Sequence, residues 1–107
     1  MTTAKFLFSG DTIVSFELSG HSGYAEEGAD IVCSAVSSAV YMAANTIIEI
    51  VKLNPETVVR DGYLKVHMNM DDARKSKVIT DGLYLHLGEL QNQYPNNLKL
   101  ERGVFDA

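Results

Sequence analysis

The sequence is poor in the residues that mark disulfide-stapled, metal-binding and membrane-spanning proteins. Cys33 is its single cysteine, so no disulfide can form within the chain, and a reducing compartment is expected. No Cys/His cluster supplies the roughly three or four ligands that zinc prefers. No uncharged apolar run reaches about 18 residues, and the first apolar run is too short for a signal peptide. We therefore expect a cytoplasmic protein without a metal or a membrane span.

Basic residues are also in the minority. The formal net charge is −5, from nine Lys and Arg against fourteen Asp and Glu, and this balance argues against broad binding to a phosphate backbone. The one basic cluster, RKSK at residues 74–77, is interpreted as a solvated helix face. Neither a P-loop nor a dinucleotide-binding glycine motif is present. The sequence therefore predicts no direct nucleic-acid binding and no cofactor.

What the chain does contain is enough apolar residues for one core. It has 107 residues, of which 46% are hydrophobic. A chain of this size buries roughly two thirds of the surface that its unfolded form exposes. Residues 1–107 are therefore expected to form a single domain.

The first half of the chain has the pattern of a β-hairpin followed by a helix. Apolar and polar residues alternate on both sides of Gly10-Asp11, which predicts two strands with one buried face. From Ile31 to about Leu53 the apolar residues recur at helical spacing, and Asp30 stands where an N-cap would. The helical stripe is Val32, Val36, Val40, Ala43 or Ala44, Ile47 and Val51.

The second half repeats this pattern. Strands over Thr57–Arg60 and Tyr63–Met70 are predicted around the turn Asp61-Gly62, with a second helix from Asp72 that Pro95 ends. The stripe of this helix is Ile79, Leu83, Leu87, Leu90 and Tyr94, and Leu98 and Leu100 supply a short last strand. The order ββαββαβ predicts an α+β fold in which two helices pack on a mostly antiparallel or mixed sheet.

The connection between the first hairpin and the first helix is unusually long. It runs from Gly20 to Asp30, whereas the second hairpin reaches its helix within Asp71–Ala73. A long loop of this kind is often functional. Its glycines, Gly20, Gly23 and Gly28, predict a flexible segment.

This loop begins with a histidine and leads to the helix that carries the cysteine. At a helix start, free amides and the helix dipole favour a thiolate and could stabilise an oxyanion, so Cys33 is a candidate nucleophile with His21 as its base. Asp30, Glu26 and Glu27 are all candidates to orient the imidazole. The alternative is a Cys33 that merely fills space in the core.

Asp30 and Ser37 likewise each have a functional and a structural interpretation. Asp30 is either a helix cap or a residue that assists the histidine. Ser37 lies one turn after Cys33, where it could hydrogen-bond near the sulfur or serve as a small packing residue. The functions open from the residues are a thiol enzyme, a noncatalytic protein-binding module, and a thiol redox sensor, which would lack a second cysteine in the chain.

The histidine-to-cysteine stretch resembles the bacterial ribosomal-processing cysteine proteases called Prp. The resemblance is carried by Gly20-His21 and, after the loop, by a G-x-D-I-V-C-x-x-V-S motif over residues 28–37. The length, the ββαββαβ order and Tyr94-Pro95-Asn96 extend it to nearly the whole chain. Ser22 and Ser34 are small departures where alanine is more usual.

The resemblance implies a cysteine endopeptidase of the bacterial cytoplasm. Its substrate would be a large-subunit ribosomal protein, the twenty-seventh of that subunit, whose short N-terminal extension is removed after a pair of aromatic residues before ribosome assembly. His21 would be the general base and acid, Cys33 the nucleophile and Asp30 an assisting acid. A homodimer without a cofactor is implied. In this ribosomal context the noncatalytic alternative is a ribosome-assembly module in which Cys33 belongs to the core.

Overall fold

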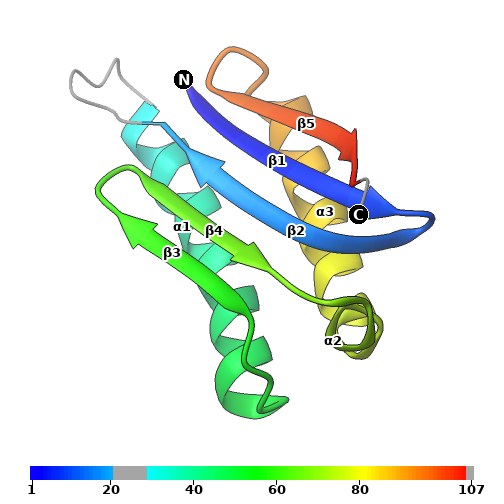
Figure 1. Ribbon diagram of the computed structural model, residues 1–107. Helices are drawn as coiled ribbons and strands as arrows, with labels where there is room; N and C mark the ends of the chain where they lie inside the picture. The colour runs from blue at the N-terminus through cyan, green and yellow to red at the C-terminus, as the bar shows by residue number, and fades with distance from the viewer. Residues whose placement is uncertain (21–28, 106–107) are drawn as a thin grey trace.

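The protein is a five-stranded sheet with its helices gathered on one face, as Figure 1 shows. The computed structural model describes residues 1–20 and 29–105. Its elements in chain order are β1 (Thr2–Ser9), β2 (Thr12–Ser19), α1 (Ala29–Asn45), the π-helical turn η1 (Thr46–Ile50), β3 (Glu56–Arg60), β4 (Tyr63–His67), α2 (Met70–Lys75), α3 (Lys77–Gln93) and β5 (Leu98–Val104).

The sheet is mixed, as the sequence predicts. Its strand order is β3-β4-β2-β1-β5, with β5 parallel to β1 and every other neighbouring pair antiparallel. The register between β1 and β2 shifts after Leu7, which pairs with Ser15, while Phe8 pairs with Ile13. Val14 is therefore the extra residue of a bulge, and its carbonyl accepts the Met68 amide at 2.8 Å.

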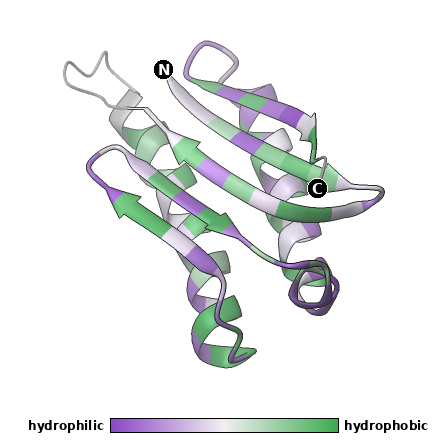
Figure 2. Ribbon diagram, in the orientation of Figure 1, coloured by the Kyte–Doolittle hydropathy of each residue, from purple (hydrophilic) through white to green (hydrophobic). Residues whose placement is uncertain are grey.

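The core lies between the sheet and the helices α1 and α3. Along β1 and β2 the residues alternate between hydrophobic and hydrophilic (Figure 2), which is typical of a sheet covered on one face. Phe6 and Phe16 stack with ring centroids 6.2 Å apart, and Tyr84 of α3 meets the Phe6 ring edge-on at 5.1 Å. The predicted stripe of the first helix is confirmed up to Ile47, because Val32, Val36, Val40, Ala43, Ala44 and Ile47 are all buried. Val51, its last predicted member, is only half-buried and lies just after η1, which ends at Ile50.

This packing also explains part of the apolar character of the first helical region. Residues 31–50 have the length and mean hydropathy, 1.7, of a membrane span, although the sequence predicts none. About a third of that stretch, 33%, is buried inside the protein. The buried residues are the stripe that packs in the core, and they account for part of the hydropathy. The rest comes from exposed apolar residues, among them Ile31, Met42 and Ile50.

The second helix differs from its prediction at both ends. It begins at Met70 instead of Asp72, because the Asn69 side chain accepts the Asp72 amide at 2.8 Å as an N-cap. It is also divided into α2 and α3 at Ser76. At the other end, α3 stops at Gln93, before Tyr94.

Tyr94 was wrongly placed in the buried stripe. Its side chain is 38% exposed, and its carbonyl accepts the amides of Asn97 and Leu98, so it belongs to the turn before β5. The last strand is longer than predicted and runs from Leu98 to Val104. Its full pairing with β1 accounts for the extra length.

Gly20 closes the end of β2 against the start of the chain, and its backbone tolerates no side chain. Its φ is +136°, and a Cβ there would lie 2.7 Å from the Met1 carbonyl oxygen. Gly10 is a matched control, because its φ is +63° but no atom lies within 4 Å of an added Cβ. We expect Gly10→Ala to cost about 1–2 kcal/mol and Gly20→Ala distinctly more, as measured by urea unfolding. Equal losses would contradict the close approach at Gly20.

Candidate active site

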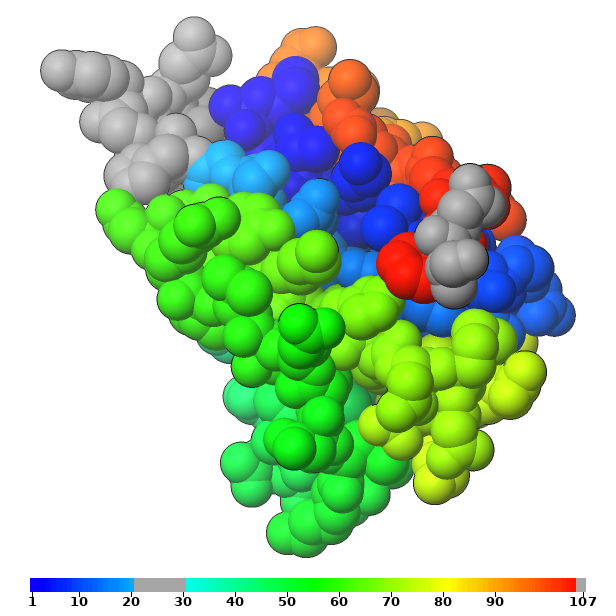
Figure 3. Space-filling view, in the orientation of Figure 1, coloured from blue at the N-terminus to red at the C-terminus, as the bar shows by residue number. Residues whose placement is uncertain are grey.

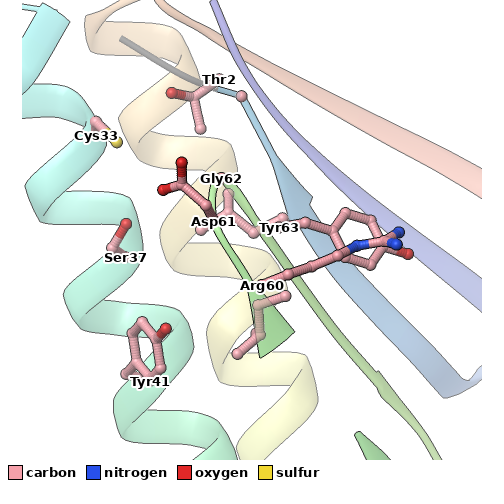
Figure 4. Close-up of a pocket in the computed structure, with 11 residues that line it drawn as sticks. Thr2, Cys33, Ser37, Tyr41, Arg60, Asp61, Gly62 and Tyr63 are labelled. Atoms are coloured by element: carbon pink, nitrogen blue, oxygen red, sulfur yellow. The ribbon is translucent and has the colours of Figure 1, made fainter. Parts of the chain in front are cut away.

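A cavity of about 230 Å³ opens between α1 and the end of the sheet where β2 stops and β3 turns into β4. Figure 4 shows its two main walls, which are one face of α1 and the β3–β4 turn. The lining residues are Thr2, Leu18, Gly20, Cys33, Ser37, Tyr41, Arg60, Asp61, Gly62, Tyr63 and Leu64. The cavity thus contains the only cysteine of the chain.

The α1 wall consists of Cys33, Ser37 and Tyr41. Residues four apart lie above one another on a helix, so these three side chains form a row along α1, as Figure 4 shows. Cys33 is a free thiol at intermediate burial, so it neither fills the core nor projects fully into solvent. Ser37, also half-buried, lines the same cavity, and its hydrogen bond near the sulfur stays a prediction.

The start of α1 differs from the prediction. The helix begins at Ala29, so Asp30 lies inside the first turn and is not the N-cap residue. Alanine is the strongest helix former, which favours the earlier start. Cys33 is therefore the fifth helical residue, one turn in. Since helical side chains lean toward the N-terminus, the thiol still lies over the first turn, whose amides have no helical acceptor.

The β3–β4 turn contributes a carboxylate that sequence reasoning missed. Asp61 lines the cavity, and Figure 4 shows its side chain directed inward, on the side of Cys33 and Ser37. From the sequence, Asp61-Gly62 reads only as a hairpin turn, and Gly62 does have the positive φ of +71° that such a turn requires. No local signal indicates that this turn faces the first helix.

The turn is held in place by contacts on both of its flanks. The Tyr63 hydroxyl donates to the Glu17 carboxylate at 2.5 Å, and this hydrogen bond raises the pKa of Tyr63 above its usual value of 10.0. The Arg60 guanidinium lies over the Tyr63 ring, 4.7 Å from its centroid. The Gly20 amide donates to the Gly62 carbonyl at 3.2 Å. The turn is thereby attached to the end of β2.

Several predicted site residues lie outside the described residues. These are His21, Gly23 and Gly28, and the side chain of Asp30 is not described either. Gly20, the last described residue before His21, lines the cavity. The pairing of His21 with Cys33 therefore stays a prediction. The structure supports it only by placing Gly20, the residue before His21, at the wall of the cavity.

The remaining histidines do not line this cavity. His67 lies near Phe105, with ring centroids 5.0 Å apart, and His86 is exposed on α3. Within residues 1–20 and 29–105, no three His, Cys, Asp or Glu side chains come together in a way that could hold a metal ion.

A free thiol on the first helix, facing a carboxylate across an open cavity in an α+β sheet protein, defines a candidate thiol-dependent hydrolase. Comparison with known families makes the assignment specific. The model of the family described as cysteine protease Prp matches residues 1–99. The chain belongs to this family, which confirms the resemblance found from the His-to-Cys motif, and it is a cysteine protease.

Individual relatives agree with the family match. The ribosomal processing cysteine protease Prp of Bacillus subtilis is 31% identical over 98 residues, covering 86% of this chain and 88% of the relative. Its counterpart from Staphylococcus aureus is 25% identical over 85 residues, covering 78% of this chain and 80% of the relative.

Solved structures share the fold over almost the entire chain. Prp from S. aureus in complex with a substrate peptide superposes with a TM-score of 0.86 at 20% identity, covering 95% of this chain and 99% of that one. A protein from Streptococcus mutans gives a TM-score of 0.80 at 25% identity, covering 98% of this chain and 96% of that one. The predicted α+β fold class is confirmed.

Proposed function

We propose that this protein is the ribosomal-processing endopeptidase of a bacterium. Its substrate is the N-terminal extension of a large-subunit ribosomal protein, the twenty-seventh of that subunit, and cleavage takes place in the cytoplasm where ribosomes assemble. The observation that carries the proposal is the half-buried Cys33 thiol at the wall of an open cavity. The names of the relatives from B. subtilis and S. aureus support the substrate class.

In the proposed mechanism Cys33 and His21 act as a dyad. The His21 imidazole takes the thiol proton, and the sulfur attacks the scissile carbonyl carbon to form a tetrahedral oxyanion. The free amides at the start of α1 face the region of the sulfur and stabilise this charge. The carbon–nitrogen bond then breaks, and the imidazolium donates its proton to the leaving amine. Water, activated by the same imidazole, hydrolyses the thioester and frees Cys33.

Asp61 is the described carboxylate best placed to orient the imidazole. A base that reaches the Cys33 sulfur must lie within hydrogen-bond reach of it, and hence inside the cavity that Asp61 also lines. A carboxylate there stabilises the imidazolium that forms during the reaction. Asp30, the residue that the resemblance favours, is the competing candidate. Asp61 acts through the histidine and is a positioning residue.

We also propose that the enzyme is a homodimer that associates through α1 and α3. On the helix layer, Met42 and Val78 are 63% and 88% exposed. They line an apolar groove together with Ala39, Ala43, Ile79 and Leu83. A closed symmetric dimer would cover such an exposed apolar face.

The endopeptidase proposal predicts removal of a short N-terminal peptide from the extended ribosomal protein. Mass spectrometry after incubation should show the shortened product with the wild-type chain, and none with Cys33→Ala or His21→Ala, because the dyad has lost its nucleophile or its base. Ser34→Ala, next to the nucleophile but exposed, is the matched control and should cleave normally. Product formed by Cys33→Ala would rule out the dyad.

If Asp61 orients the His21 imidazole, Asp61→Asn lowers kcat at least about 10-fold with little change in KM. Asp61→Glu, which keeps the carboxylate, partly restores kcat. Asp11→Asn, the same substitution in the other hairpin turn, should be neutral. Peptide cleavage rates check both. If Asp30→Asn is the damaging variant and Asp61→Asn is not, the orienting carboxylate is Asp30.

The dimer predicts a sedimentation mass of twice the chain, and a shift to the monomer in Val78→Asp, because a buried charge at the interface is costly. Leu85→Asp is the control, since Leu85 is also exposed, at 65%, but does not line the groove. A monomeric wild-type protein would refute the homodimer.

A further inference from the structure

The outer edge of β3 is open beside the candidate active site. β3 is the terminal strand of the sheet, and within the described part of the chain it pairs only with β4. All five of its residues are exposed, including Val58 at 43% and Val59 at 61%. Figure 3 shows the green β3–β4 hairpin at the margin of the molecule. An uncovered edge strand with exposed valines is a template for another strand.

The hydrogen bonds of β4 determine which of its backbone groups face β3. Ser19 of β2 pairs with Tyr63 of β4, and just beyond this pair the Gly20 amide donates to the Gly62 carbonyl. In an antiparallel ladder, a hydrogen bond between the two residues just beyond a pair means that the pair itself is not hydrogen-bonded. The backbone groups of Ser19 and Tyr63 therefore do not bond to each other. The backbone groups of Tyr63, and by alternation those of Lys65, therefore point toward β3.

The pairing of β3 with β4 then determines which backbone groups of β3 can bond to another chain. Val58 pairs with Lys65 and Arg60 with Tyr63, so the backbone groups of Val58 and Arg60 bond inward to β4. By the same alternation, the N–H and C=O groups of Thr57 and Val59 point outward from the sheet. These two residues offer an extended chain both donors and acceptors.

This edge leads into the cavity of Cys33. Arg60, the last residue of β3, and Asp61, which follows it, both line the cavity. An extended peptide advances about 3.3 Å per residue, so a peptide bonded to Val59 enters the cavity within about two residues. Val59 pairs with the buried Leu64, so its side chain lies on the helix side of the sheet, the side of the cavity wall formed by α1.

We propose that the peptide substrate binds as an additional strand on the outer edge of β3. The backbone of Thr57 and Val59 forms its main-chain hydrogen bonds, and the Val59 side chain contacts apolar residues of the peptide. The scissile bond then lies beyond Arg60, next to the Cys33 thiol. This inference rests on the proposed endopeptidase function, and it assigns the substrate an extended conformation along the outer edge of β3.

The direct test removes one outward donor. Val59→Pro deletes the Val59 N–H without deleting a β4 ladder bond, and proline is tolerated on such an edge. We expect KM for a substrate peptide to rise about 10-fold, since one main-chain hydrogen bond is lost and the side-chain contact changes as well, with kcat nearly unchanged. Val59→Ala keeps the donor and should raise KM less. An unchanged KM in Val59→Pro would overturn the edge-strand mode.

A second test needs no change in the protein. Substrate peptides with a single N-methylated amide, moved one residue at a time, should bind to Cys33→Ala with losses at every second position, because alternate amides of an added strand face β3. Fluorescence anisotropy measures this binding. Losses without that alternation would overturn the inference even if Val59→Pro fails to fold. A wild-type chain that cleaves none of the peptides would instead contradict the proposed function itself.

Discussion

The packing of α1 on the sheet is the constraint on which the candidate active site depends. Val32, Val36 and Val40 are buried against the strands, and this stripe sets the rotation of the helix about its own axis. Each residue of the α1 wall of the cavity follows one of these valines in the sequence, beginning with Cys33. Because successive helical residues are about 100° apart, burying the valines turns the thiol to the flank of the core, where it is half-buried and accessible.

The opposite wall depends on strand pairing between distant parts of the chain. β4 pairs with β2, and this register attaches the Asp61-Gly62 turn to the strand end that precedes the loop with His21. The thiol, the carboxylate and the start of the loop therefore converge on one cavity, although they come from three elements. Among the described residues, the outer edge of β3 in the same hairpin has no neighbouring strand, so in our proposals one structural unit both positions a carboxylate and receives an extended chain.

Much of this arrangement is predictable from local pattern. Two-residue alternation indicated the strands, and helical spacing indicated both the buried stripe and the position of Cys33 near a helix start. The order ββαββαβ indicated a mixed sheet under helices, and the His-to-Cys motif indicated the family. These features depend on residues close together in the sequence, which is why periodicity and motif spacing detect them.

The features that were missed depend on capping and on tertiary contact. Asn69 rather than Asp72 starts the second helix, because the Asn69 side chain is the one that accepts a first-turn amide. Asp61 was read as a turn residue because nothing in its neighbours encodes what the turn faces. The open edge of β3 could be recognised only after the strand order was known, since an edge is a property of the whole sheet.

The central claim is that Cys33 is a nucleophile reached by a peptide held in this cavity. It is tested most directly by treating the wild-type protein with a chloromethyl ketone of the peptide that precedes the cleavage site. Tandem mass spectrometry of the digested protein should find one adduct per chain, on Cys33, formed much faster than with a scrambled peptide and absent in Cys33→Ala. Equal rates for the two peptides, or modification at another residue, would contradict the claim.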